Sequence, residues 1–204
     1  PQIIAYDNLI VTKITEGGGG GGGLIFQDDF SDNSSDWALW SDGPYYKTYF
    51  QGGTYIFEML KETNSCEFFP GDLDLGPNYD VELTTTWKSG KDDRPYGLCI
   101  GSEASNRLNF SVSGNGWTTV FGHRDNTLIE PDPIPWESGT STVGNGKTSN
   151  LIKVEVRGAQ MTFYVNGNLI GTVNSHIPAG QHKVGMFVDS PQKIEFDNLK
   201  VYQY

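Results

Sequence analysis

Lys193-Ile194-Glu195-Phe196-Asp197-Asn198-Leu199-Lys200-Val201 is the clearest structural signal in this 204-residue chain. Polar and apolar residues alternate along it, which predicts a β-strand with one buried face. The pattern also occurs at the start of the chain, where residues 1–11 align with residues 191–201 without a gap. Seven of the eleven aligned positions are identical. This repeat predicts that residues 1–14 are the closing strand of a preceding copy of the domain.

An unbroken run of seven glycines, Gly17–Gly23, follows the first copy. Glycine has no side chain to bury and the greatest backbone freedom, so residues 15–23 are predicted to be a linker. Residues 24–204 then form one domain, long enough to bury a sizeable core. Adjacent repeat domains of the same protein are expected partners. A lone closing strand also has unpaired backbone groups, so we expect residues 1–14 to add to a sheet edge and mediate self-association.

The composition favours strands and argues against two classes of partner. Aromatic residues make up 13% of the chain and 26 residues are glycine, while no long segment has helical apolar spacing. The formal net charge of −11 argues against nucleic acid and anionic membrane surfaces, because both attract clustered Lys and Arg. No stretch is apolar enough to span a membrane. Because the chain opens inside a repeat, we expect the natural N-terminus to be missing.

Short alternating segments recur along residues 24–204 at the spacing typical of a β-sandwich. About twelve strands are predicted, at residues 24–30, 45–50, 53–61, 79–87, 96–101, 107–113, 117–122, 150–157, 161–165, 169–173, 184–188 and 194–202. Asn166-Gly167 is the strongest hairpin signal, because both central residues of a type I′ turn need positive φ. Residues 128–146 carry three prolines and are predicted to be irregular. The predicted fold class is all-β, a two-sheet antiparallel β-sandwich.

Six short motifs follow one another along the predicted strands: Asp28-Asp29-Phe30-Ser31, Tyr96-Gly97-Leu98, Phe110-Ser111-Val112-Ser113-Gly114-Asn115-Gly116, Ile152-Lys153-Val154-Glu155-Val156-Arg157-Gly158, Phe163-Tyr164-Val165-Asn166-Gly167 and Phe196-Asp197-Asn198-Leu199-Lys200-Val201. In this order they resemble the concanavalin A-like lectin/glucanase jelly rolls. The nearest subgroup is similar to the bacterial laminin-G-like domains related to the 3-keto-disaccharide hydrolase family. The resemblance spans residues 24–204 and implies two facing antiparallel sheets. It also implies a module appended to enzymes or surface proteins, in some members with a sugar ligand.

Paired carboxylates are the catalytic groups to look for, because glycosidases place an acid and a base or nucleophile across the scissile bond. Glucanases of the resembled fold carry them on one strand as Glu-x-Asp-x-x-Glu. The nearest segment here is Glu130-Pro131-Asp132-Pro133-Ile134-Pro135-Trp136-Glu137. Its spacing differs and its three prolines oppose a regular strand, so we interpret it as a loop rather than a catalytic site. The three histidines, His123, His176 and His182, show no metal-ligand spacing.

A structural calcium ion is the one cofactor that the sequence suggests. Ca²⁺ takes several oxygen ligands, and in jelly-roll binding modules it often lies where the opening strand meets the closing one. Asp28 and Asp29 belong to the predicted opening strand and Asp197 to the closing one. Asp29 and Asp197 are the predicted ligands, and the ion would hold the two ends of the domain together. The alternative is that Asp29 makes a turn and Asp197 faces solvent.

A sugar-binding platform is a further hypothesis. Sugar rings stack on flat aromatic faces while planar polar groups hold their hydroxyls, and loops and strand ends commonly carry such sites. The candidates lie at predicted turns or strand ends: Tyr45, Tyr46, Trp117, His123, Arg124 and Trp136. The alternative is that most of the five tryptophans belong to the core, with Trp87 on its alternating strand the clearest case.

Cys66 and Cys99 are the only cysteines. The sequence leaves open whether they form a disulfide in an oxidising compartment or are two buried apolar residues. Together the patterns favour a non-catalytic carbohydrate-binding or structural module from a multidomain bacterial protein with tandem repeats, located outside the cell or on its surface. The alternatives are a glycoside hydrolase-like enzyme acting on a disaccharide or polysaccharide, and a protein-interaction module.

Overall fold

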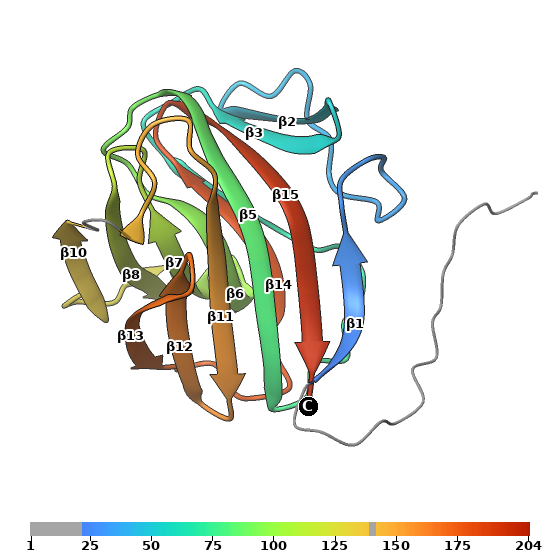
Figure 1. The fold of residues 1–204 in the computed structure, drawn as a ribbon, viewed down its shortest axis with the longest axis vertical. Helices are drawn as coiled ribbons and strands as arrows, with labels where there is room; N and C mark the ends of the chain where they lie inside the picture. Colours follow the sequence, from blue (N-terminus) through green and yellow to red (C-terminus); the bar gives the residue numbers. More distant parts are fainter. Residues whose placement is uncertain (1–21, 139–141) are drawn as a thin grey trace, which may run out of the picture.

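The computed structural model describes residues 22–138 and 142–204, so the predicted strand copy at residues 1–14 and most of the predicted linker lie outside the described range. The described chain contains fifteen β-strands in two antiparallel sheets that face each other (Figure 1). The predicted fold class, a two-sheet antiparallel β-sandwich, is confirmed. No helix within these ranges is long and apolar enough to cross a membrane.

One sheet has eight strands, in the order β13-β12-β11-β5-β15-β3-β2, with β1 also paired to β15. Its strands are β1 (Gly23–Asp28), β2 (Tyr46–Gln51), β3 (Thr54–Met59), β5 (Asn78–Gly90), β11 (Asn150–Arg157), β12 (Gln160–Val165), β13 (Asn168–Asn174) and β15 (Gln192–Gln203).

The other sheet has seven strands, in the order β10-β8-β7-β6-β14-β4, with β9 also paired to β8. Its strands are β4 (Asn64–Phe68), β6 (Tyr96–Glu103), β7 (Asn106–Val112), β8 (Trp117–Arg124), β9 (Thr127–Leu128), β10 (Ile134–Ser138) and β14 (Lys183–Asp189).

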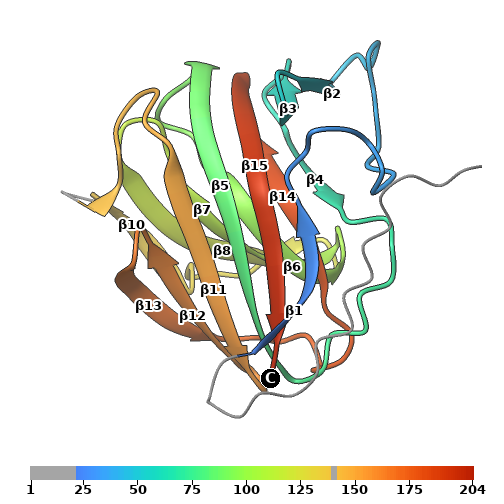
Figure 2. The same ribbon diagram turned by 45° about the vertical axis from the view of Figure 1, so that its right-hand side comes forward.

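The strand that contains residues 193–201, β15, lies inside the eight-stranded sheet (Figure 2). One edge of β15 pairs with β5 along its length, and the other pairs first with β3 and then with β1. The ladder with β5 shifts between Asp197 and Lys200, where Asn198 has a φ of 52°. Asparagine tolerates this left-handed conformation better than most residues. Because Gly23 pairs with Gln203, the two ends of the domain lie together.

The alternation predicted for residues 193–201 supplies one row of the core. Ile194 and Phe196 are fully buried before the shift, and Leu199 and Val201 are fully buried after it. The extra residue at Asn198 changes the buried positions from even to odd numbers, and the same face of β15 stays in the core. Truncating a core aromatic residue such as Phe196 to alanine typically costs about 3–5 kcal/mol of stability.

Alternation locates twelve of the observed strands, whereas β4, β9 and β10 are not among the predicted ones. β10 lies inside the segment predicted to be irregular, so that prediction is wrong for residues 134–138. The physical reason is position: β10 is an edge strand paired only with β8, and an edge strand tolerates Pro135 on its unpaired side. β4 is also an edge strand, and it pairs only with β14.

Cys66 and Cys99 form a disulfide, which answers the question that the sequence leaves open. They lie on β4 and β6, the two neighbours of β14, and their Cα atoms are 6.9 Å apart. The bond spans β14 beside Gly185, which pairs with Cys99. A Cβ atom at Gly185 would lie 2.3 Å from the carbonyl oxygen of Glu67, so the absence of a side chain there lets β4 approach closely. The disulfide therefore fixes an edge strand to the middle of its sheet.

Candidate functional site

The seven-stranded sheet has one face in the core and one face turned away from it, called the outer face below (Figure 1). Alternation along β7 defines this face. Leu108 and Phe110 point into the core, so Arg107, Asn109 and Ser111 point to the outer face. Direct pairing of β7 with β8 and of β6 with β14 extends the same face across the sheet.

Trp117 and Trp136 are the exposed tryptophans of the seven-stranded sheet. Trp117 begins β8 and its backbone pairs with Ser138 of β10. Trp136 precedes Ser138 by two residues, in the stretch of β10 where the register against β8 shifts, so the two tryptophans lie on adjacent paired strands near the same end of β8. Their side chains are 39% and 38% exposed. Two adjoining aromatic surfaces are therefore open to a ligand at the β8–β10 edge.

A polar strip follows β7 and includes His123 of β8, at the opposite end of β8 from Trp117. Arg107 is only 6% exposed. Its Nε donates to Asn109 Oδ1 (3.2 Å), its Nη2 donates to Asn64 Oδ1 (3.0 Å), and its Nη1 donates to the carbonyl of Ala104. Further atoms of this strip are buried without a hydrogen-bond partner: Asn109 Nδ2, Ser111 Oγ and His123 Nδ1. Buried polar atoms are satisfied in most proteins, which makes these three unusual.

Positive charge gathers at one end of the strip. His123 pairs with Arg107 across the β7–β8 ladder, and burial together with the charge of Arg107 lowers the pKa of His123. Burial also lowers the pKa of Arg107 itself. His176 Nε2 donates to the carbonyl of His123 (3.0 Å), and burial with the nearby charge of Arg124 lowers the pKa of His176. Asp125, which follows β8, acts on His176 in the opposite direction.

Two phenylalanines meet over the outer face. The rings of Phe121 on β8 and Phe187 on β14 have centroids 5.2 Å apart, although β7 and β6 lie between their strands. Arg107 Cζ lies 5.8 Å from the centroid of Phe187. Gly97, which pairs with Phe187, has no side chain to fill the space between. Phe187 is fully buried while Phe121 is partly exposed, so Phe121 is the one that solvent reaches.

The outer face does not carry the carboxylate pair that a glycosidase requires. Asp189 on β14 is the only acidic residue at an outward position on the described strands of this sheet, and burial raises its pKa. Glu67 on β4 pairs with Met186, so it points to the core side. Glu137 on β10 pairs with the buried Thr118, so it likewise lies at a position that does not face outward.

The remaining predicted sugar-binding residues lie elsewhere. Tyr45 precedes β2 and Tyr46 begins it, on the eight-stranded sheet, so neither joins Trp117. The ring of Tyr46 packs at 5.3 Å against Phe57, and burial with the neighbouring Glu67 raises its pKa to about 12. Arg124 ends β8 at the opposite end from Trp117. The structure thus brings Trp117 together with Trp136, and it separates both from the tyrosines.

The predicted calcium ligands are close in the fold. Asp28 pairs with Leu199, so β1 ends beside the Asp197 segment of β15. Burial, with the negative charge of Asp29 as a smaller cause, raises the pKa of Asp197. Asp29 also accepts the Ser31 amide (3.0 Å), as the turn alternative predicts. Within the described ranges no three His, Cys, Asp or Glu side chains gather as a metal site, so main-chain oxygens and water would have to complete this one.

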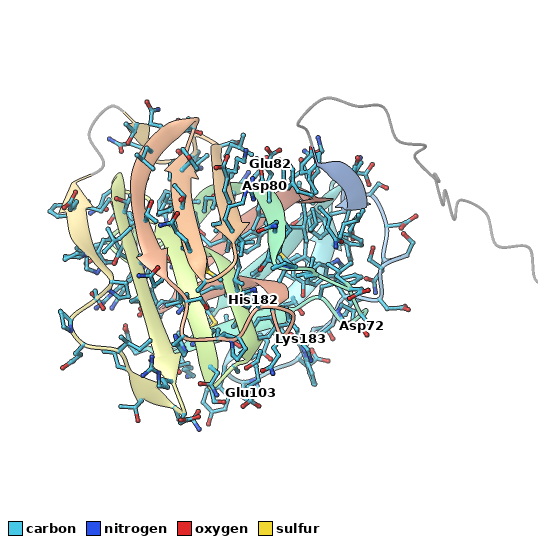
Figure 3. The ribbon with its side chains drawn as sticks, turned by 90° about the horizontal axis from the view of Figure 1, so that it is seen from below. Asp72, Asp80, Glu82, Glu103, His182 and Lys183 are labelled. Carbon is cyan, nitrogen blue, oxygen red and sulfur yellow. A yellow bond between two sulfur atoms is a disulfide. The ribbon has the colours of Figure 1, made fainter. Side chains whose placement is uncertain are left out.

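Two groups of polar residues lie at the lower end of the sandwich (Figure 3). His182 and Lys183 line a cavity of about 20 Å³ with Asp72, which holds about one water molecule and no sugar. Asp80 lies on β5 and is nearly buried. It accepts from Arg157 (2.8 Å) and lies 3.0 Å from Lys153 Nζ, so its charge is balanced. Neither feature offers an open binding surface.

Comparison with known proteins finds similarity in structure and none in sequence families. No family model matches the chain, and no curated protein matches it. A protein of unknown function with a galectin-like fold from Bacillus subtilis has a TM-score of 0.64 and 13% identity, covering 90% of this chain and 97% of its own. The carbohydrate-binding module CBM66 from Bacillus subtilis has a TM-score of 0.59 and 14% identity, covering 90% and 98%.

Enzymes share the same architecture. The laminarinase catalytic domain from Thermotoga maritima has a TM-score of 0.65 and 11% identity, covering 90% of this chain and 99% of its own. At these identities the likeness establishes architecture, and a fold shared by binding modules and enzymes does not decide activity. With its two facing antiparallel sheets and these neighbours over nine-tenths of its length, the chain has the concanavalin A-like jelly-roll fold.

Proposed function

We propose that this domain is a non-catalytic carbohydrate-binding module that holds a glycan on the outer face. The observation that carries the proposal is the pair Trp117 and Trp136, both more than one-third exposed on the adjacent paired strands β8 and β10. Large exposed aromatic surfaces beside polar groups are typical of binding sites. Arg107 and Asn109 lie on the neighbouring strand and supply polar groups of the kind that hold sugar hydroxyls.

The described strands of the seven-stranded sheet carry no outward carboxylate pair, and for a glycan held on this face that favours a module over a glycoside hydrolase-like enzyme acting on a disaccharide or polysaccharide. The neighbours include both kinds of protein, so their names alone do not separate the two. A protein-interaction module is the third candidate. Its support is the exposed Leu39, Trp40 and Tyr45 near β2, a separate apolar surface.

The cellular location of the domain and the kind of protein that contains it are part of the same proposal. The Cys66–Cys99 disulfide supports an extracellular or cell-surface location, because such bonds persist in oxidising compartments. The repeated stretch at residues 1–11 supports a multidomain bacterial protein with tandem repeats of laminin-G-like type. Residues 1–14 would then belong to the neighbouring domain or pair with an edge strand of another copy.

Binding calorimetry with a panel of soluble polysaccharides tests the function. We expect the wild type to bind at least one glycan, and Trp117→Ala and Trp136→Ala each to weaken that binding about fivefold or more. Trp40→Ala is the matched control, because Trp40 is 52% exposed and lies outside the outer face. Equal affinity in all four proteins would contradict the proposal. Release of reducing sugar from a bound polysaccharide would instead support the hydrolase.

A structural Ca²⁺ bound by Asp29 and Asp197 is a second proposal, supported by the meeting of β1 and β15 and by the effect of the Asp29 charge on the pKa of Asp197. A ligand that binds only the folded state raises the melting temperature. We therefore expect added Ca²⁺ to raise the Tm of the wild type and to leave the Tm of Asp197→Asn unchanged. Scanning calorimetry with Ca²⁺ and with a chelator checks this, and identical wild-type curves would refute it.

A further inference from the structure

Arg107 is a buried cation without a counter-charge. It is 6% exposed, and no carboxylate of the described residues lies within ion-pair distance of it. All three of its hydrogen-bond acceptors are neutral oxygens, on Asn64, Asn109 and Ala104. Asp80 shows the usual arrangement, since two cations balance its buried charge. Burial of an unpaired charge costs free energy, and an anion bound next to the Arg107 guanidinium would offset that cost.

The neighbours of Arg107 also have unused hydrogen-bonding groups. Asn109 Nδ2 can only donate, and it is buried without an acceptor. His123 Nδ1 is buried without a partner on the adjacent strand, directly across from Arg107. Ser111 Oγ is buried without a partner two residues beyond Asn109. These atoms and the guanidinium match a group rich in acceptor oxygens.

A second cation lies in the row of Arg107. Lys183 on β14 pairs with Gly101, which in turn pairs with Arg107, so Lys183 shares the outer face and the same row. Asp189 is the single outward carboxylate on the described strands of the seven-stranded sheet, and it makes no ion pair with Arg107.

Phe121 lies beside these atoms, since it pairs with Asn109 and its ring centroid is 6.5 Å from that of His123. The three unpartnered atoms lie out of contact with solvent, and Phe121 and Phe187 meet over the same face. Phe121 is partly exposed, whereas Phe187 is fully buried and lies close to Arg107. Rotamer changes of exposed side chains are fast and small in cost compared with backbone movement. Phe121 can therefore turn away from Phe187 without opening the sheet.

We propose that Arg107, Asn109 and His123 form a subsite for the carboxylate or sulfate group of an acidic sugar unit, and that Phe121 turns aside to admit it. The subsite rests on the proposed glycan-binding function and gives it a substrate class. His123 comes six positions after Trp117 on β8, which corresponds to about 20 Å along the strand. An extended acidic oligosaccharide would thus stack on the tryptophans and place a charged unit beside Arg107.

Calorimetric titration with three oligosaccharides of equal length tests the subsite: an oligogalacturonate, a sulfated galactan and a neutral galactan. We expect wild type to bind at least one acidic oligomer about tenfold or more tightly than the neutral one. Which acidic oligomer binds distinguishes carboxylate from sulfate. Arg107→Gln should reduce the acidic affinity to the neutral value, and Phe121→Ala should preserve or raise it. An equal fractional loss of acidic and neutral affinity in Arg107→Gln would overturn the subsite.

A salt titration of the wild type keeps the test valid if Arg107→Gln fails to fold. Raising the ionic strength should weaken acidic binding and leave neutral binding unchanged. Equal affinity for the acidic and neutral oligomers would overturn the subsite while leaving the tryptophan platform in place. Acidic binding that does not change in Arg107→Gln would also overturn it. Binding of none of the three oligomers, nor of the polysaccharide panel, would overturn the glycan proposal and the subsite with it.

Discussion

His182 is buried immediately before β14, where it joins two parts of the fold. Its Nε2 lies 3.2 Å from the Ile177 carbonyl, which can only accept, so Nε2 carries the proton. Its Nδ1 then accepts from the Tyr79 hydroxyl at 2.9 Å. Nδ1 can accept from Tyr79 only in the neutral ring, whereas Nε2 can donate to Ile177 in either form, and burial lowers the pKa of His182. The pairing of His182 with Tyr79 therefore depends on pH.

The lowered pKa sets the sign of a stability prediction. The folded protein binds the His182 proton less readily than the unfolded chain does, so this contribution is present above the ordinary histidine pKa of about 6.5 and is lost as pH falls below it. We expect the free energy of unfolding to decrease from about pH 7.5 to about pH 5.5, and to decrease less in His182→Gln.

Urea unfolding at the two pH values and constant ionic strength measures this difference. Burial lowers the pKa of His123 and His176 as well, so the variant should keep part of the wild-type decrease. An equal decrease in wild type and His182→Gln would show that the Tyr79–His182 pair does not carry the effect.

Strands that bury one face are predictable from the sequence, because alternation is a direct consequence of strand geometry. The Asn166-Gly167 turn is equally clear, and both residues have the positive φ that a type I′ turn needs, 51° and 80°. The edge strands β4 and β10 are not predictable in this way. They are short, β10 contains Pro135, and their position at an edge is a property of the assembled sheet.

The candidate site is likewise predictable in part from the sequence and in part only from the assembled sheet. Trp117 and Trp136 can be named from the sequence as aromatic residues at strand ends, yet their adjacency depends on the β8–β10 pairing. Arg107, Asn109 and Ser111 alternate with core residues, a signal that identifies one face of β7. That this face holds a cation without a counter-charge is visible only once the neighbouring strands are placed.

The disulfide gives a prediction for β4. It closes a loop across a sequence separation of 33 residues, and its loss should destabilise the domain by roughly 3–4 kcal/mol through the larger entropy of the unfolded chain. We expect the double variant Cys66→Ala/Cys99→Ala to unfold at lower urea concentration than wild type. Reductant should shift the wild-type midpoint and leave that of the variant unchanged. Coincident curves for wild type and variant would contradict this role.

The whole domain brings its two ends together, since Gly23 pairs with Gln203. In the proposed tandem array, each copy would therefore be joined to the next through the same pole of the sandwich. The outer face would then stay free of the junction. Short flexible linkers between copies raise the effective concentration of neighbouring sites, so a repeating glycan would bind the array more tightly than a single domain.

Nuclear magnetic resonance tests directly whether a glycan binds at Trp117 and Trp136. The indole N–H signals of ¹⁵N-labelled protein are recorded during titration with the best-binding glycan of the panel. We expect the signals of Trp117 and Trp136, the exposed tryptophans of β8 and β10, to shift. Trp37, whose indole donates to Asp28 at 2.9 Å in the core, should stay unchanged. Shifts confined to Trp40, or glycan binding that shifts the signal of neither Trp117 nor Trp136, would contradict a glycan site at these two residues.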